Sequence, residues 1–321
     1  MLKTMKHVLE PSGATTHGVF SRDLAPVLTV DSGDSVQMSF PDAGWHCLSQ
    51  AHPLDYESMQ KVDYEPEGSV GHCLVGPIWV RGAEPGMVLE IAIDRVDPGT
   101  WGWGAAGGWD TSLNAALGLG EGTEECRLVW ELDGAHARNQ FGDVVTLRPF
   151  PGVIGMPPPA PGAHSTIPPR RWGGNLDCRE LIAGARLFLP IPVRGGLVSL
   201  GDGHGAQGDG ELSGIAIECP LSRLDVTLTL HPDLRLSHPR AETALGPTAF
   251  GVAPSLDRAT AIAVDGMVGW MSDRWGIPRT RALALASLVV DVRVTQVVNG
   301  VVGVHAVLVE DRLEVGIRAR V

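Results

Sequence analysis

Glycine and proline are spread along the whole chain, and this punctuation most limits what the chain can fold into. The 321 residues include 41 glycines and 24 prolines, which interrupt regular elements and favour turns. Between them lie short apolar runs such as residues 88–93 and 224–230. The second run alternates apolar and polar residues, as a half-buried strand does. The pattern predicts many short strands joined by turns.

Helices are expected only late in the chain. Ser255 is a suitable N-cap for a helix that runs to about residue 272. Pro278 suits the first turn of a second helix that ends near residue 288. Further strands are expected at residues 27–30, 35–40, 78–80, 186–190, 197–200, 215–218, 301–304 and 306–309. Strands first and helices last indicate a mainly β or α+β fold.

The chain divides into three expected regions. Residues 1–20 form an N-terminal leader, and residues 21–240 form a β-rich body that contains the active site. Residues 241–321 contribute the helical pair and closing strands, packed on the same body. Residues 101–109 are rich in glycine and tryptophan, and we expect a long loop there.

Charge and composition exclude several classes of partner. The net charge is -12, whereas a nucleic-acid binder needs a basic surface to neutralise phosphates. Apolar residues make up 44% of the chain and charged residues 19%, which is typical of a soluble globular protein. No apolar run reaches the roughly 18 residues of a membrane span, and the five dispersed cysteines suggest reduced thiols. We therefore expect a cytoplasmic protein with no nucleic-acid or membrane partner.

One glycine-framed polar segment, residues 201–211, could carry chemistry. Asp202 and His204 are two residues apart, so both project to one face if the strand from residue 197 continues. A carboxylate and an imidazole so placed can bind a divalent metal. The segment also contains Gln207, Asp209 and Glu211. A polar turn without metal would explain the same residues equally well.

Other polar candidates lie outside this segment. Asn175 and Asp177 follow two glycines, and Glu218 lies seven residues after Glu211. His72 is a further candidate, although a single histidine is more often a structural hydrogen-bonding group. His46 and His52 rank lower because no glycine-framed turn presents them.

Several blocks of the sequence are similar to those of one known family. The blocks are VRGAEPGMVLE at residues 80–90, PGVIG at 151–155, GGNLD at 173–177, PVRGGLVSLGDGHGAQGDGE at 192–211 with the later Glu218, and DVRVTQVV at 291–298. In this set and order, the chain resembles the acetamidase/formamidase family. The resemblance implies a β-sandwich-like body with a smaller α+β portion. It also implies hydrolysis of formamide- or acetamide-like substrates, homo-oligomers, and a divalent metal, zinc with calcium as the second option.

The resemblance leads to a specific assignment of roles. We expect the metal to be held by Asp177, Asp202, His204 and Glu218. Glu211 is expected to be the general base, with His72 and Asn175 orienting the substrate. Gln207 and Trp103 are expected to contact the substrate.

Three alternatives remain open at this point. Covalent amidases use Ser-Ser-Lys or Glu-Lys-Cys arrangements, but the chain has three lysines, of which only Lys61 lies within the expected body. Cys73 and Cys178 lie close to motif residues, so a thiol role needs a test. A ligand- or carbohydrate-binding module could use Trp101, Trp103 and Trp109 as a platform. An inactive relative that keeps the fold is the third alternative.

Overall fold

Strands dominate the architecture. The structure is a computed structural model, and it describes residues 4–48, 59–66, 71–309 and 313–315. Within these residues the strands form four sheets and are accompanied by three helices. The expectation of a mainly β, α+β fold is confirmed. His52 lies outside the described residues.

Two large sheets form the body. The nine-stranded sheet has the order β1 (Lys6–Leu9), β4 (Asp34–Phe40), β17 (Leu221–His231), β8 (Val88–Pro98), β15 (Arg186–Pro190), β18 (Arg240–Thr243), β19 (Gly246–Ala253), β21 (Val302–Leu308) and β20 (Val290–Gln296). The six-stranded sheet has the order β14 (Gly173–Asn175), β13 (Phe150–Gly155), β16 (Gly196–His204), β7 (Leu74–Val80) and β2 (Thr16–His17), with β3 (Leu28–Val30) also paired to β7.

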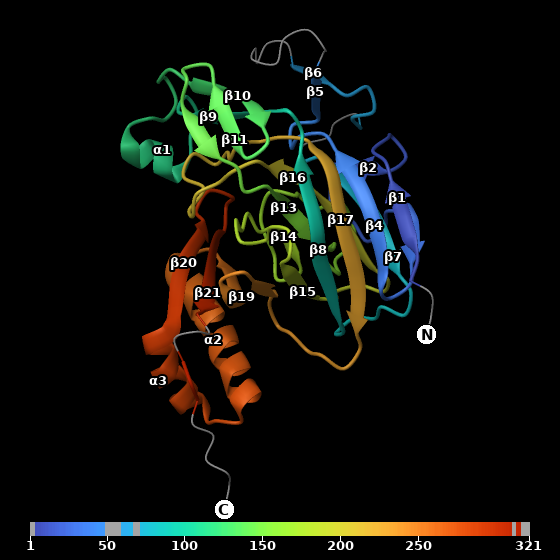
Figure 1. Cartoon of the computed structure of the whole chain (residues 1–321), viewed down its shortest axis with the longest axis vertical. Helices are drawn as coiled ribbons and strands as arrows, with labels where there is room; N and C mark the ends of the chain where they lie inside the picture. Colours follow the sequence, from blue (N-terminus) through green and yellow to red (C-terminus); the bar gives the residue numbers. More distant parts are fainter. Residues whose placement is uncertain (1–3, 49–58, 67–70, 310–312, 316–321) are drawn as a thin grey trace, which may run out of the picture.

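The main core fills the space between these sheets. Strand β4 alternates buried and half-buried residues, and its Val36 and Met38 enter the same apolar cluster as Ile78 of β7 and Leu200 of β16. Each fully buried apolar side chain of this size stabilises the fold by about 1.5–3 kcal/mol. The arrangement is a sandwich, with β4, β8 and β17 forming one wall (Figure 1).

Two expected turns carry the chain from one sheet to the other. Residues 31–33 connect β3 to β4, and residues 81–87 connect β7 to β8. In both cases the first strand belongs to the six-stranded sheet and the second to the nine-stranded sheet. The predicted strands are therefore present, but they flank corners of the sandwich and do not pair with each other.

The C-terminal part forms a second, smaller core. Helices α2 (Leu256–Trp275) and α3 (Arg279–Val289) pack against β19, β20 and β21 (Figure 1). Ser255 caps α2 by accepting a hydrogen bond from the backbone N–H of Arg258, as the sequence predicts. Pro278 directly precedes α3. The nine-stranded sheet runs without interruption from β15 through β18 into β19, so this part shares a sheet with the body.

The first twenty residues contribute to both sheets. Strand β1 pairs in parallel with β4 of the nine-stranded sheet. Strand β2 pairs with β7 of the six-stranded sheet.

A third sheet corrects the expectation of a long loop at residues 101–109. Residues 101–106 form strand β9 (Trp101–Ala106), which pairs with β10 (Cys126–Asp133), followed by β11 (His136–Asn139) and β12 (Val144–Thr146). The short helix α1 (Ser112–Leu117) and the pair β5 (His46–Leu48) and β6 (Met59–Lys61) complete the described elements.

The glycines that suggested a loop instead allow close backbone packing. A Cβ on Gly102 would lie 2.7 Å from the carbonyl oxygen of Glu218, and one on Gly104 would lie 2.9 Å from that of Ala216. The prediction of a strand at residues 215–218 is also wrong. That segment forms only single bridges, through which Glu218 joins both Trp103 and His204.

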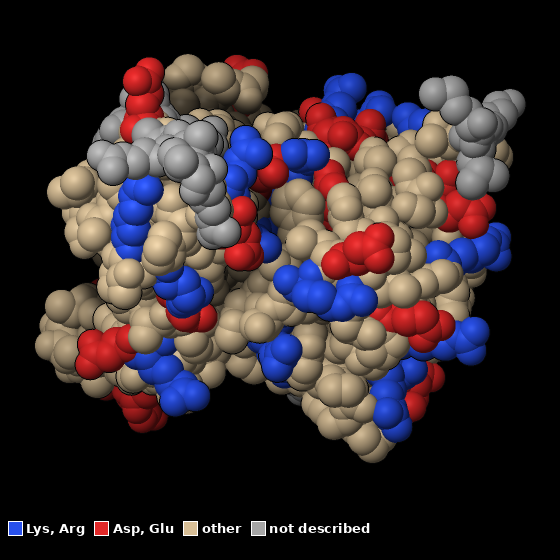
Figure 2. Space-filling model, turned by 90° about the horizontal axis from the view of Figure 1, so that it is seen from below, with Lys and Arg blue, Asp and Glu red and all other residues tan. Residues whose placement is uncertain are grey.

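The helices of the described residues and the charged side chains at the surface both bear on the expected absence of membrane and nucleic-acid partners. None of the helices in the described ranges combines the length and apolar character needed to cross a membrane. Basic and acidic side chains are interspersed over the face shown in Figure 2.

The close packing at Gly102 makes a stability prediction. Gly102→Ala forces the new Cβ against the backbone of Glu218, and we expect the free energy of unfolding to fall by about 1–3 kcal/mol. Gly13→Ala is the control, because its Cβ would meet only an ordinary contact, 3.5 Å from Cβ of Tyr64. Urea titration of both variants measures the difference, and equal stabilities would contradict the packing argument.

Candidate active site

A cavity of about 230 Å³ opens beside the ends of β9, β14 and β16. Its lining includes seven of the nine residues that the sequence predicts for the site: His72, Trp103, Asn175, Asp202, His204, Glu211 and Glu218. The structure thus brings together residues that are up to 146 positions apart, from His72 to Glu218.

The ionisable groups converge on His204. Both Asp202 and His204 lie on β16, which continues to residue 204 as the motif predicts. His204 Nε2 is 3.3 Å from Asp202 Oδ1 and 3.5 Å from Glu218 Oε1. A second group of ligand atoms, from Asp177, His204 and Glu211, lies within 4.8 Å of one another. All five of these residues are buried.

Three of these carboxylates sit on unusual backbone. Asp177, Asp202 and Glu211 have φ values of 49°, 62° and 49°, in the left-handed region that non-glycine residues seldom adopt. Such conformations cost about 1–3 kcal/mol each and concentrate at functional sites. The surrounding packing therefore holds these side chains in directions that an ordinary strand or turn would not give them.

Gly152 of β13 forms one wall of the cluster. A Cβ at this position would lie 2.4 Å from Asp202 Oδ2 and 2.9 Å from Asp177 Oδ1. Only glycine therefore leaves room for both carboxylates, which explains why the PGVIG block contains a glycine here.

Gln207 orients the imidazole of His204 by contacting Nδ1, the ring nitrogen that does not face Asp202 and Glu218. Its Oε1 is 2.8 Å from His204 Nδ1, and its Nε2 donates to the backbone carbonyl of Asp177 at 2.8 Å. An amide oxygen can only accept, so Nδ1 carries a proton, and Nε2 faces Asp202 and Glu218. Gln207 does not line the cavity. The expectation that it contacts the substrate is corrected, because the chain turns after β16 and directs the amide behind the imidazole.

The cluster contains more acidic groups than the nearby positive charge can stabilise in ionised form. Burial, with Glu211 and Asp202 nearby, holds the pKa of Asp177 well above its usual range. Burial raises the pKa of Glu211 to about 8 and also raises the pKa of Glu218. Burial opposes the charge of His204, but Asp202 and Glu218 outweigh it and raise its pKa.

Asp202 is the exception among the four carboxylates. Burial disfavours its charge, but His204 and His72 outweigh burial and hold the pKa of Asp202 below its usual range. One carboxylate thus stays ionised next to His204 while three others resist ionisation. This imbalance is what a cation would relieve.

The donor set fits a divalent cation. Ligands at about 2.0–2.1 Å in tetrahedral geometry lie roughly 3.3–3.4 Å apart, close to the two separations measured at His204 Nε2. Asp177 Oδ1 and Glu218 Oε2 are buried without a hydrogen-bond partner among the described residues. A histidine whose other ring nitrogen is held by a hydrogen bond is the usual arrangement for a metal-binding imidazole.

Three further residues position the site and escaped the sequence analysis. Thr166 is fully buried, and its hydroxyl is 2.9 Å from His72 Nδ1 and 3.0 Å from the backbone nitrogen of His72. Asp42 accepts hydrogen bonds from Trp103 Nε1 at 2.6 Å and from the backbone N–H of His46 at 2.6 Å. Asn299 lines the cavity from the C-terminal part. No local pattern marks Thr166 or Asp42, whereas Asn299 directly follows the family block at residues 291–298.

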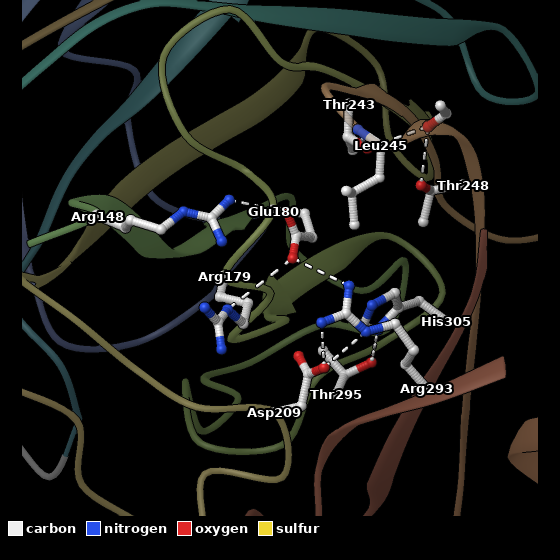
Figure 3. Close-up of polar contacts among 11 residues, drawn as sticks. Arg148, Arg179, Glu180, Asp209, Thr243, Leu245, Thr248, Arg293, Thr295 and His305 are labelled. Carbon is white, nitrogen blue, oxygen red and sulfur yellow. Dashed lines mark hydrogen bonds and ion pairs between the residues drawn. The ribbon is translucent and has the colours of Figure 1, made fainter. Parts of the chain in front are cut away.

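A network of ion pairs supports the acidic segments (Figure 3). Glu180, three residues after Asp177, is buried and bonds Arg148 at 2.9 Å and Arg293 at 3.1 Å. Arg293 also pairs with Asp209, two residues before Glu211, at 2.6 Å. The segments that carry Asp177 and Glu211 are thereby tied to β20.

The residues that covalent mechanisms would need are poorly placed. Burial raises the pKa of the Cys178 thiol to about 12 and also raises the pKa of Cys73. Their thiolates are therefore scarce at neutral pH. Lys61 pairs with Glu65 at 3.1 Å and does not line the cavity.

Known proteins are similar to this chain in sequence and in fold. Residues 4–162 and 160–247 match the Acetamidase/Formamidase family. The chain belongs to this family. A formamidase from Methylophilus methylotrophus is 28% identical over 249 residues, which cover 61% of this chain and 59% of that protein. An acetamidase from Mycolicibacterium smegmatis is 27% identical over 275 residues, 68% of this chain and 65% of that protein. The match thus spans less than two thirds of either relative's own length.

A solved structure agrees over nearly the whole chain. The crystal structure of an acetamidase from Yersinia enterocolitica has a TM-score of 0.80 and 27% identity, covering 96% of this chain and 93% of that one. The acetamidase/formamidase fold therefore includes the C-terminal helices and the strands β19–β21.

The ion pairs of Glu180 make a prediction for the pH dependence of stability. Burial raises the pKa of Glu180, but Arg148 and Arg293 outweigh it and keep the pKa below its usual range. A depressed folded pKa stabilises the fold above the unfolded value, near pH 4.3, and this stabilisation is lost as pH falls through the folded pKa. We expect Glu180→Gln to lower the free energy of unfolding by about 1–3 kcal/mol at pH 7. The difference from wild type should shrink below about pH 4.

Urea titrations at pH 7 and pH 3.5 measure this difference. Glu242→Gln is the matched control, because Glu242 also pairs with an arginine but its side chain is 50% exposed, so its loss should cost less than about 1 kcal/mol. A Glu180→Gln difference that stays the same at both pH values would contradict the charge argument.

Proposed function

We propose that this member of the acetamidase/formamidase family hydrolyses small, neutral, linear amides to a carboxylate and ammonia with the help of a divalent metal ion, zinc. The observation that carries the proposal is the buried cluster around His204, in which Nε2 faces two carboxyl groups. The relatives named formamidase and acetamidase support the choice of substrate class. We assign the metal to Asp202, His204 and Glu218, whose ligand atoms lie within 4.8 Å of one another. The fourth assigned ligand is Asp177, which forms a second such group with His204 and Glu211.

Amide hydrolysis needs an activated water, a polarised carbonyl and a proton for the leaving nitrogen. A divalent ion supplies Lewis acidity, which polarises the carbonyl oxygen and lowers the pKa of water near it. Glu211, which lines the cavity, would take the proton from the attacking water and return it to the leaving nitrogen. Its pKa near 8 suits both transfers at neutral pH, because an acid–base catalyst works best when its pKa lies near the working pH.

The other cavity residues suit a small neutral substrate. Asn175 Oδ1 is buried and has no partner among the described residues, so it is available to accept a hydrogen bond from the substrate N–H. His72 is held at Nδ1 by Thr166, which leaves Nε2 for the substrate. Trp103, Ile167 and Ile215 add apolar surface. The lining drawn from the described residues includes no lysine or arginine, which argues against an anionic substrate.

The rival proposal of an aromatic binding platform is weaker. Trp101 is buried, with 4% exposed surface, and so cannot present a ring to a ligand. Trp103 donates its indole N–H to Asp42 and borders the same cavity as the carboxylates. Trp103 is thus part of the cavity wall and Trp101 is buried, so these two rings do not form a separate exposed surface.

Ammonia release from formamide, acetamide and propionamide, with and without a chelator, tests the proposal. We expect release by the wild type, and a loss of more than about 100-fold after metal removal or in Asp202→Ala and His204→Ala. Zinc added back should restore the chelated wild type but not the variants. Unchanged activity in the chelator and in both variants would exclude metal-assisted hydrolysis, and no ammonia from any substrate would favour an inactive relative.

Iodoacetamide separates the proposal from thiol catalysis. Cys73 and Cys178 are buried and have raised pKa values, so alkylation of the native protein should leave at least roughly 90% of the amidase activity. Cys73→Ala and Cys178→Ala variants provide the control, because they remove each thiol without reagent. Inactivation that one of these variants prevents would point to a covalent mechanism.

A further inference from the structure

Asn299 reaches the active site from the part of the chain that follows the family match. It lies in the turn between β20 and β21, whereas the matched residues end at 247. Its Nδ2 donates to Asp177 Oδ2 at 2.7 Å and is 3.5 Å from Glu211 Oε2. One amide group therefore contacts two of the four buried carboxylates.

The contact determines which oxygen of Asp177 faces the cluster. Asn299 occupies Oδ2, while Oδ1 has no partner among the described residues and lies near the wall formed by Gly152. Asp177 has a φ of 49°, so its backbone alone does not favour this direction. A hydrogen bond from an amide fixes the rotation of the carboxylate and leaves Oδ1 available as a ligand.

The amide also bridges two closely placed carboxyl groups. The ligand atoms of Asp177 and Glu211 lie within 4.8 Å of each other. The amide nitrogen carries two N–H groups, so it can donate to both at once.

The turn that presents Asn299 is held in place from within. Gln296 Oε1 accepts the backbone N–H groups of Val298 at 2.9 Å and Asn299 at 3.2 Å, and Gln296 Nε2 donates to the carbonyl of Val301 at 2.9 Å. Gln296 is fully buried. The position of Asn299 is thus built into the fold before any ligand binds.

The same hairpin is fastened to both acidic segments. The backbone N–H of Gly210 donates to Thr295 at 3.0 Å, and that of Val297 donates to Gly210 at 3.2 Å. Arg293 of β20 bonds Asp209 through Nε at 2.7 Å and Glu180 at 3.1 Å, as Figure 3 shows. Movement of the hairpin would therefore shift the carboxylates of Asp177 and Glu211 with it.

We propose that Asn299 is a positioning residue of the active site, which orients Asp177 and Glu211 through its single amide group. The C-terminal β20–β21 hairpin is then a functional part of the site as well as a packing element. This inference rests on the proposed metal-assisted hydrolysis, since it assigns Asp177 Oδ1 to the metal and Glu211 to proton transfer.

Asn299→Leu and Asn299→Ala test the inference together. Leucine keeps most of the side-chain volume and removes both donors, whereas alanine removes volume and donors. If donation matters, both variants should lower the zinc affinity of the metal-free protein and kcat by about 10- to 100-fold. Val292→Ala is the control, because Val292 lies on the same strand β20 and is 48% exposed. It should match the wild type.

The readouts are zinc titration against a colorimetric chelator, kcat and KM for acetamide, and the melting temperature. A lower melting temperature with unchanged zinc affinity and kcat in both variants would show a purely structural role and overturn the inference. Retention of both quantities by the leucine variant alone would do so as well, because packing would then suffice.

The zinc titration keeps this inference separable from the proposed function. A wild type that binds zinc without hydrolysing any amide would contradict the proposed function, while loss of zinc affinity in the leucine variant would still support positioning by Asn299. A wild type that neither binds zinc nor releases ammonia would overturn both.

Discussion

The burial of four carboxylates around one imidazole is the constraint on which the rest of this structure depends. Charges removed from water cost several kcal/mol each unless they are paired or bound to a cation. The chain meets this cost locally through His204 and through the amide of Asn299. The imbalance that remains is the physical reason for a metal in the proposed mechanism.

Holding these carboxylates together requires contributions from distant parts of the fold. Strand β16 carries Asp202 and His204, and Gly152 of β13 leaves the space that their neighbours need. Strand β9 brings its backbone against Glu218, which is possible because Gly102 has no side chain. The left-handed backbone at three of the carboxylates shows that packing, and not local preference, sets their directions.

The C-terminal helices support the active site indirectly, through the strands that they cover. They cover the strands β19–β21, and the turn after β20 delivers Asn299 to Asp177. Arg293 then links that strand to Glu180 and Asp209, which belong to the segments that carry Asp177 and Glu211. Stability of the small core and geometry of the active site are therefore coupled through one hairpin.

Local patterns in the sequence were sufficient for a definite set of features. Alternation and punctuation identified eight of the 21 described strands, the late helices and the cap at Ser255, because these depend on neighbours a few residues away. The spacing of Asp202 and His204 was informative for the same reason, since residues two apart on a strand share a face. Residues 101–106 were misassigned to a loop. The sequence alone does not distinguish a glycine that allows strands to pack closely from a glycine that allows an irregular loop.

Only the tertiary structure decided how the site is completed. Asn299 and Asp177 are 122 residues apart, and Thr166 and His72 are 94 apart. Gln207 belonged to the right segment, but the turn after β16 placed it behind His204. Sequence spacing constrains contacts within one strand or turn, whereas contacts between remote segments depend on how the two sheets and the C-terminal hairpin pack. The sequence by itself thus determined the family, the late helices, part of the strands and the pair on β16, and packing decided which oxygen atoms meet.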